Sequence, residues 1–216
     1  MKREYSVIAF DLDGTLTDSK GGLIAGFVYA FKKLSIPYES EESLTRFIGP
    51  PLWETWKNEF GFTDEETERA ILTFREYYNV YGWWDNKIYP GISELLLSLK
   101  EMGKTLVVAT SKPEDTAKKV LRLFGIDKHF DFIGGADGHK KRDKKEEVIK
   151  YSLDAVGATD MKEVLMVGDR SYDAVGARVF GIDSVGVLWG HGTEEEIKSS
   201  GFTYIISEPQ ELLSIV

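Results

Sequence analysis

The sequence predicts an α/β fold with a parallel sheet and an inserted helical domain. Three short apolar runs, residues 7–10, 106–109 and 164–167, are rich in β-branched side chains and lack polar alternation. That pattern is typical of strands buried on both faces of a sheet. Helical patterns lie between the runs, and such alternation favours parallel strands covered by helices. Only the interval from about residue 20 to 87 departs from it, with helical periodicity and no convincing strand.

Shorter patterns predict the other elements in chain order. A helix is expected over 92–102, where apolar residues recur at helical spacing up to Gly103. Pro113 is expected as an early helical residue, because its fixed φ suits the first turn of a helix, which continues toward Gly125. A further helix is expected over 146–156. Additional strands are expected at 130–133, 184–187 and 204–206, and a capping box of Thr193 and Glu196 opens a last helix.

The interval between the first two apolar runs is predicted to form a helical cap. Thr63 and Glu66 have the spacing of a capping box, which opens a helix through residue 78. An earlier helix has one apolar stripe, formed by Leu23, Ile24, Phe27, Val28, Phe31 and Leu34. Loop-like segments flank the interval. We therefore expect a core domain of residues 1–16 and 88–216 and a helical cap domain of residues 17–87.

Charge and composition exclude several classes of protein. Lys and Arg number 27 and Asp and Glu 36, and the net charge of −9 argues against binding a nucleic-acid polymer or an anionic membrane. The absence of cysteine excludes disulfides, thiolate metal sites and cysteine nucleophiles. No apolar run reaches the roughly 20 residues of a membrane span, and the first is too short for a secretory signal. We expect a cytoplasmic protein, for which a monomer is one compatible state.

Polar side chains follow each of the three apolar runs. They are Asp11 and Asp13 after the first run, Thr110 and Ser111 after the second, and Asp169 and Asp173 after the third. In open α/β sheets, ligands bind at the carboxyl ends of the strands. We therefore expect these segments, although far apart in sequence, to converge on one site.

The residues at the strand ends resemble the motifs of a known family. Residues 10–16, Phe-Asp-Leu-Asp-Gly-Thr-Leu, are similar to the first motif of the haloacid dehalogenase superfamily in its phosphatase form. Residues 110–113 resemble the second motif, and residues 168–173 resemble the fourth. A helical insertion between the first and second motifs resembles the C1 cap of that superfamily. The most similar branch is phosphoglycolate phosphatase-like and includes 5′-nucleotidases, since residues 47–52 resemble a segment common there.

This resemblance implies a Rossmann-like core that hydrolyses a small phosphomonoester through an aspartyl-phosphate on Asp11. Such an intermediate divides a very slow reaction into two easier steps. Attack of one anion on another requires charge neutralisation, which Mg²⁺ supplies as a hard cation with oxygen ligands. The implied ligands are the carboxylates of Asp11 and Asp169 and the backbone carbonyl of Asp13, with Asp173 acting through water or behind them. Asp13 is also the implied general acid and base.

The resemblance also implies groups that hold the phosphoryl oxygens. These are the Thr110 hydroxyl and the backbone amides after it, beginning with Ser111. A lysine of the third motif balances the phosphoryl charge, and four lysines lie within residues 140–145. The family pattern places a lysine three residues before the valine of a Glu-Val-Ile segment, which favours Lys145 and leaves Lys144 as second choice. We expect the other lysines of this run at the surface.

Two questions stay open at the level of sequence. Four tryptophans lie in the cap interval, Trp53, Trp56, Trp83 and Trp84. They either pack the cap or form a stacking wall for a planar leaving group. The function has alternatives that share the core residues: a phosphomutase, an inorganic pyrophosphatase and, least favoured, a receiver-like phosphoacceptor. The partner expected in each enzymatic case is a small phosphorylated metabolite.

Overall fold

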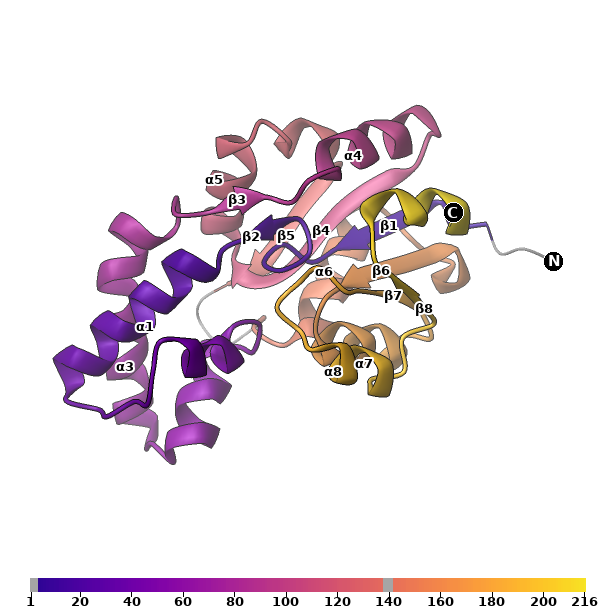
Figure 1. Cartoon of the computed structure of the whole chain (residues 1–216). Helices are drawn as coiled ribbons and strands as arrows, with labels where there is room; N and C mark the ends of the chain where they lie inside the picture. Colours follow the sequence, from indigo (N-terminus) through magenta and orange to yellow (C-terminus); the bar gives the residue numbers. More distant parts are fainter. Residues whose placement is uncertain (1–3, 138–141) are drawn as a thin grey trace. The chain divides into compact units, whose positions relative to one another are not determined.

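The chain divides into two compact units, of which one is an α/β core and the other is helical (Figure 1). A computed structural model describes residues 4–137 and 142–216. The core unit runs through Asp18 and resumes at Ile88, and the helical unit spans Ser19–Lys87. The first boundary between the units therefore lies two residues beyond the predicted one. A short strand lies at each boundary, and the two strands pair with each other. These strands are β2 (Thr17–Asp18) and β3 (Lys87–Ile88).

The core unit contains a six-stranded parallel sheet with the order β5-β4-β1-β6-β7-β8. Its first strand, β1, lies between β4 and β6, and later strands of the chain lie on both sides of it. This arrangement confirms the predicted α/β fold. The strands are β1 (Val7–Phe10), β4 (Thr105–Pro113), β5 (Phe132–Ala136), β6 (Val164–Gly168), β7 (Asp183–Val187) and β8 (Tyr204–Ile206).

The central strands lack polar alternation because helices cover both of their faces. Every residue of β1 and β6 is buried. Val7 and Ala9 of β1 pack in one apolar cluster with Val148 and Ile149, which follow in the helix after β5. The core helices are α4 (Ile92–Glu101), α5 (Glu114–Leu123), α6 (Lys145–Ala155), α7 (Ser171–Val179), α8 (Glu194–Ser199) and α9 (Leu212–Ile215). Short 3₁₀ turns link them at Asp127–His129, Met161–Glu163 and Pro209–Glu211.

The start of α5 differs from the prediction. Pro113 is not an early helical residue but the last residue of β4 and the N-cap of α5, with φ −52° and ψ 132°. The ring of proline fixes φ but leaves ψ free, so the residue can stay extended. Glu114 and Asp115 then occupy the first turn, where carboxylates favour the positive end of the helix dipole.

The helical unit is built around its two long helices, α1 (Lys20–Leu34) and α3 (Asp64–Tyr77). Gly22 permits the close approach of α1 to the π-helical turn η3 (Tyr78–Gly82), since a Cβ there would lie 2.0 Å from the Gly82 carbonyl oxygen. The predicted capping box of α3 is confirmed. The Glu66 amide donates to the Thr63 hydroxyl over 3.3 Å, and Glu66 Oε2 accepts from the Thr63 amide over 2.9 Å. The remaining turns are Glu42–Phe47, α2 (Leu52–Glu54) and Thr55–Glu59.

The tryptophans of the helical unit have different environments. Trp56 is fully buried, with Phe27 and Phe31 at ring-centroid distances of 5.8 and 5.2 Å. Trp53 and Trp83 pack partly against the same cluster. The side chain of Trp84 is 54% exposed. Packing therefore accounts for Trp56. Across residues 4–137 and 142–216, no helix is long and apolar enough to cross a membrane.

Candidate active site

Three carboxylates meet at the carboxyl ends of β1 and β6. The two strands pair in parallel with Phe10 opposite Val167, so the residues that follow them, Asp11 and Asp169, leave the sheet side by side. Asp173 joins them from the first turn of α7. One oxygen of each carboxylate lies within 4.8 Å of the others, and all three residues are buried. Aspartates far apart in the chain therefore form one cluster, as the strand-end pattern predicts.

A buried lysine lies within this cluster. Lys145 is the first residue of α6, and its Nζ is 2.9 Å from Asp11 Oδ1 and 2.9 Å from Asp173 Oδ1. The same ammonium donates to the carbonyl oxygen of Ala109 in β4 over 3.2 Å. Lys144 is exposed. Lys140 and Lys141 lie outside the described residues.

The electrostatics of the cluster favour an additional cation. Burial is the largest cause that raises the pKa of Asp169 from 3.8 to about 8, and the charges of Asp11 and Asp173 contribute to the same rise. Burial also raises the pKa of Asp173, against the opposing effect of Lys145. For Lys145, burial lowers the pKa, but the two neighbouring carboxylates outweigh it and hold the pKa above its usual value. Lys145 thus contacts two of the three buried carboxylates, and the negative charge of the cluster is only partly compensated.

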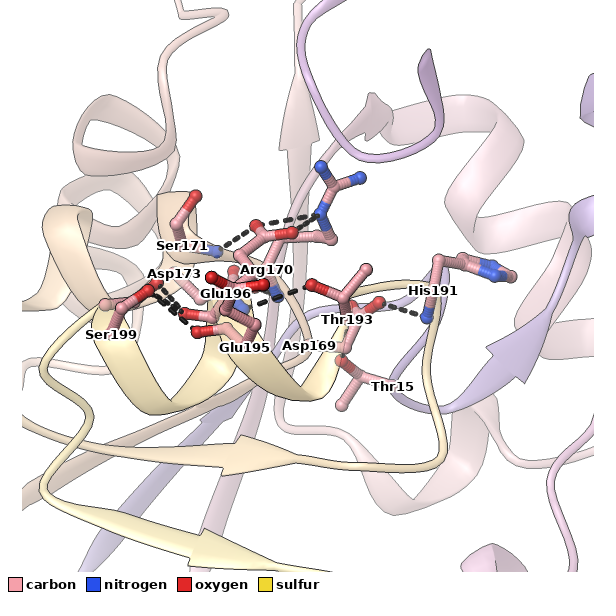
Figure 2. Close-up of polar contacts among 11 residues, drawn as sticks. Thr15, Asp169, Arg170, Ser171, Asp173, His191, Thr193, Glu195, Glu196 and Ser199 are labelled. Atoms are coloured by element: carbon pink, nitrogen blue, oxygen red, sulfur yellow. Dashed lines mark hydrogen bonds and ion pairs between the residues drawn. The ribbon is translucent and has the colours of Figure 1, made fainter. Parts of the chain in front are cut away.

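The donor set fits Mg²⁺. Hard oxygen ligands from a few carboxylates are what this ion prefers. The Asp169 carboxylate is held in place on both sides, since Thr15 Oγ1 donates to Oδ1 over 3.2 Å and the His191 amide donates to Oδ2 over 2.8 Å (Figure 2). Asp173, for which the sequence predicts a role through water or behind the ligands, has a carboxylate oxygen within 4.8 Å of oxygens of Asp11 and Asp169. The side chain of Asp13 is not part of that group.

Asp13 instead faces a second buried lysine. Lys112 Nζ donates to Asp13 Oδ2 over 2.6 Å, and the two side chains are 3% and 14% exposed. Sequence reasoning did not assign a role to Lys112. The available signal was its place at the end of β4, directly after Thr110 and Ser111, where a polar side chain lies at the same edge of the sheet as Asp11.

The two hydroxyl residues of the second motif lie at this strand end. Thr110 is buried, and its Oγ1 accepts a hydrogen bond from the Lys112 amide over 3.2 Å. Ser111 is half-buried. Tyr89 also lies in the electrostatic environment of the site, because burial raises the pKa of its hydroxyl and the charges of Asp18, Asp169 and Asp13 raise it further. The phenol therefore stays neutral.

The loop after β7 closes the site from a part of the chain without an assigned motif. Trp189 Nε1 donates to the Thr15 carbonyl oxygen over 3.0 Å, which ties this loop to the segment after β1. Gly190 approaches Asp169 so closely that a Cβ would lie 2.3 Å from the Asp169 Cβ. The bend at residues 190–192 places the His191 amide against the Asp169 carboxylate.

Helix α8 holds the segment between Asp169 and α7. Glu196 Oε1 accepts from the Ser171 amide over 2.8 Å and from Arg170 Nε over 3.0 Å (Figure 2). The predicted capping box of α8 is therefore only half formed. Thr193 Oγ1 accepts from the Glu196 amide over 3.1 Å, but the Glu196 carboxylate binds α7 instead of returning to Thr193.

Comparison with known proteins agrees with this geometry. The family model described as haloacid dehalogenase-like hydrolase matches residues 8–187. The chain belongs to this family. The match includes the strand-end residues Asp11, Thr110 and Asp169 and confirms the resemblance inferred from the motifs.

Individual relatives of this haloacid dehalogenase-like hydrolase are named for different activities. A 5′-nucleotidase of Pseudomonas aeruginosa is 37% identical, and the alignment covers 98% of this chain and 96% of the relative. The tyrosine-protein kinase PtkA of Mycobacterium tuberculosis is 38% identical over 97% of this chain and 72% of the relative. The crystal structure of a predicted phosphatase from Clostridium acetobutylicum is 39% identical, covers 98% of this chain and 97% of that one, and superposes with a TM-score of 0.94. The chain is an enzyme of the phosphatase type within the family.

Proposed function

We propose that this haloacid dehalogenase-like phosphatase hydrolyses a small phosphomonoester, with Mg²⁺ bound, through a phosphorylated Asp11. The observation that carries the proposal is the buried cluster of Asp11, Asp169 and Asp173 with Lys145 between two of them. Burying charge is costly, and strongly perturbed groups gather at functional sites. Such a cluster at the carboxyl end of a parallel sheet is better explained by catalysis than by stability.

The first step transfers the phosphoryl group to Asp11. A carboxylate oxygen attacks the phosphorus, the bond to the leaving oxygen breaks, and Asp13 protonates that oxygen. Lys145 favours the approach of the anionic substrate, because its ammonium offsets the charge of Asp11 at 2.9 Å. The Thr110 hydroxyl and the Ser111 amide hold phosphoryl oxygens, which positions the group for attack.

The second step releases inorganic phosphate. Asp13 has delivered its proton and now accepts one from water, which attacks the phosphorus and breaks its bond to Asp11. The same residue therefore acts as acid and then as base, and both carboxylates return to their initial states. Reuse of one positioned group is consistent with the place of Asp13 at the same strand end as Asp11.

Asp11, Asp169 and Asp173 are the side chains that would hold Mg²⁺. When bound, the ion neutralises charge that develops on the transferring phosphoryl group. Thr15 and the His191 amide orient Asp169 for this task through both of its oxygens. The backbone carbonyl of Asp13 remains a further proposed ligand.

The relatives suggest the order in which substrate classes should be tested. The similarity to a 5′-nucleotidase makes nucleoside monophosphates the first class to test, followed by phosphoglycolate and sugar phosphates. Residues 19–87 are proposed to act as the substrate-selecting cap. A phosphomutase and an inorganic pyrophosphatase would share the core residues and differ in the group that accepts or carries the phosphoryl group. Release of inorganic phosphate from a monoester distinguishes hydrolysis from transfer.

The test is multiple-turnover phosphate release from a panel of monoesters and pyrophosphate, with and without Mg²⁺. We expect turnover of at least one monoester that stops on addition of EDTA and returns with excess Mg²⁺. Asp11→Asn should abolish it, whereas Asp154→Asn, a change on the exposed end of α6, should not. Retained activity in Asp11→Asn would exclude Asp11 as nucleophile, and turnover in EDTA would exclude the metal. Turnover of pyrophosphate alone would favour the pyrophosphatase instead.

A further inference from the structure

The Lys112–Asp13 pair makes the two oxygens of the Asp13 carboxylate unequal. Oδ2 accepts from Lys112 Nζ over 2.6 Å. Oδ1 is buried and has no hydrogen-bond partner among the residues that the structure describes. A buried carboxylate oxygen without a partner is costly, and a catalytic role is one physical reason for a protein to retain one. One oxygen of Asp13 is thus anchored and the other is left available.

We propose that Lys112 is a positioning residue that holds Asp13 through Oδ2, so that Oδ1 exchanges the proton with the leaving group and with water. This inference rests on the proposed function, in which Asp13 is the general acid and base. It assigns the two buried lysines of the site different tasks. Lys145 contacts the nucleophile Asp11 and its neighbour Asp173, whereas Lys112 contacts the proton carrier.

The surroundings of Lys112 suit a fixed anchor. Its side chain is 3% exposed, so water competes little for the ammonium. Its backbone belongs to β4, and its amide donates to Thr110 Oγ1 over 3.2 Å. The strand shifts its register against β5 between Thr110 and Pro113. The position of the ammonium is therefore set by the same strand end that provides the proposed phosphate-binding hydroxyl.

Stability alone is a poor explanation for this pair. Desolvation of two charges often offsets their attraction, so a buried ion pair is weak support for a stabilising role. Catalytic groups, in contrast, depend on placement, and a misplacement of about 1 Å can cost about 100-fold in rate. Loss of Lys112 should leave Asp13 in the site but free its carboxylate to rotate. The chemical step that needs its proton should then slow.

The dependence on the leaving group isolates this effect. 4-Nitrophenolate leaves without much help from an acid, whereas an alkoxide needs protonation. In Lys112→Met, kcat/KM for the best alkyl monoester of the panel should fall about 100-fold, against about tenfold or less for 4-nitrophenyl phosphate. KM for the alkyl ester should stay within about threefold, because the phosphate contacts remain. A general structural defect would lower kcat/KM for both substrates by the same factor.

Lys104 provides the matched control. It is also a buried lysine, at the opposite end of β4, and its Nζ donates to the Tyr5 carbonyl oxygen over 2.8 Å. Lys104→Met should lower the melting temperature without changing the ratio of the two kcat/KM values. If Lys112→Met fails to fold, Lys112→Arg keeps the charge and moves the donor atoms. Lys112→Arg should also lower kcat/KM selectively for the alkyl ester, by about tenfold.

The outcomes separate the inference from the function on which it rests. A wild-type enzyme that releases phosphate from no monoester would overturn the proposed function. Wild-type turnover combined with equal losses on both substrates in the Lys112 variants would overturn the role of Lys112 alone. A selective loss on the alkyl ester, absent from Lys104→Met, would support it.

Discussion

The two units of the chain bury different kinds of side chain. Among its described residues, 4–18, 88–137 and 142–216, the core unit buries six that are charged: Asp11, Lys104, Lys112, Lys145, Asp169 and Asp173. Residues 19–87, all of which the structure describes, bury none. Their interior is an aromatic and aliphatic cluster that includes Phe27, Phe31 and Trp56. Five of these six charged residues belong to the site. The core unit therefore accepts the free-energy cost of buried charge at its site, whereas the interior of the helical unit consists mainly of apolar contacts.

This contrast predicts that substitutions separate by location. Removing a buried charge from the core site should lower activity far more than the loss of stability explains. Removing a buried aromatic from the helical unit should act first on stability, because apolar burial is what holds that unit together. The predictions below test this separation, from the largest expected effect to the smallest.

Lys145→Met should lower kcat/KM by about 1000-fold, since it removes the cation beside the nucleophile and leaves the Asp11 and Asp173 carboxylates without their shared ammonium. Steady-state kinetics and thermal unfolding should be measured together. The adjacent Lys144→Met is the matched control, because Lys144 is exposed, and it should leave both quantities unchanged. A loss confined to Lys144→Met would reverse the assignment of the two lysines.

Trp56→Ala should lower the free energy of unfolding by about 3–5 kcal/mol, because it opens a large cavity among Phe27 and Phe31. Trp84→Ala changes a tryptophan that is 54% exposed in the same unit and should cost much less. Urea unfolding of both variants measures the difference. Equal costs would show that the buried cluster does not hold the helical unit together.

The stability of the metal-free protein should fall as pH rises from about 4 to 8. Folding raises the pKa of Asp169 from 3.8 to about 8, so in this window the folded protein retains a proton that the unfolded chain releases. Proton binding therefore favours the folded state less as pH rises. Melting temperatures in EDTA should show the decline, and excess Mg²⁺ should reduce it. Asp169→Asn, which cannot titrate, should flatten the profile; an unchanged slope would contradict the assignment.

Thr63→Ala should have the smallest effect, about 1 kcal/mol of stability with activity retained. It removes the hydroxyl that accepts from the Glu66 amide at the start of α3. Glu65→Gln alters the same first turn outside the capping box and serves as the control. Chemical denaturation measures both. A fall in kcat greater than the fall in stability would break the separation between the two units.

Local patterns were sufficient for most of the fold. The unalternating runs at β1 and β6 predicted buried strands because such residues need cover on both faces. The capping box of Thr63 and Glu66 was also predicted from the sequence, since its two residues lie within one helical turn. Pro113 was predicted inside the helix but is its N-cap, because the fixed φ of proline does not determine ψ. In the second predicted capping box, the Glu196 carboxylate does not bind the Thr193 amide. It accepts from the Ser171 amide, a partner distant in sequence, instead.

The sequence by itself determined the strand ends and the acidic residues that follow them, because periodicity and motif spacing are properties of neighbouring residues. Only the tertiary structure decided which lysine faces Asp11, that Asp173 joins the carboxylates, and that Lys112 pairs with Asp13. Those facts depend on burial and on side-chain placement across residues up to 162 positions apart, from Asp11 to Asp173. Contacts of that kind arise from packing of the whole sheet, and no local pattern specifies them.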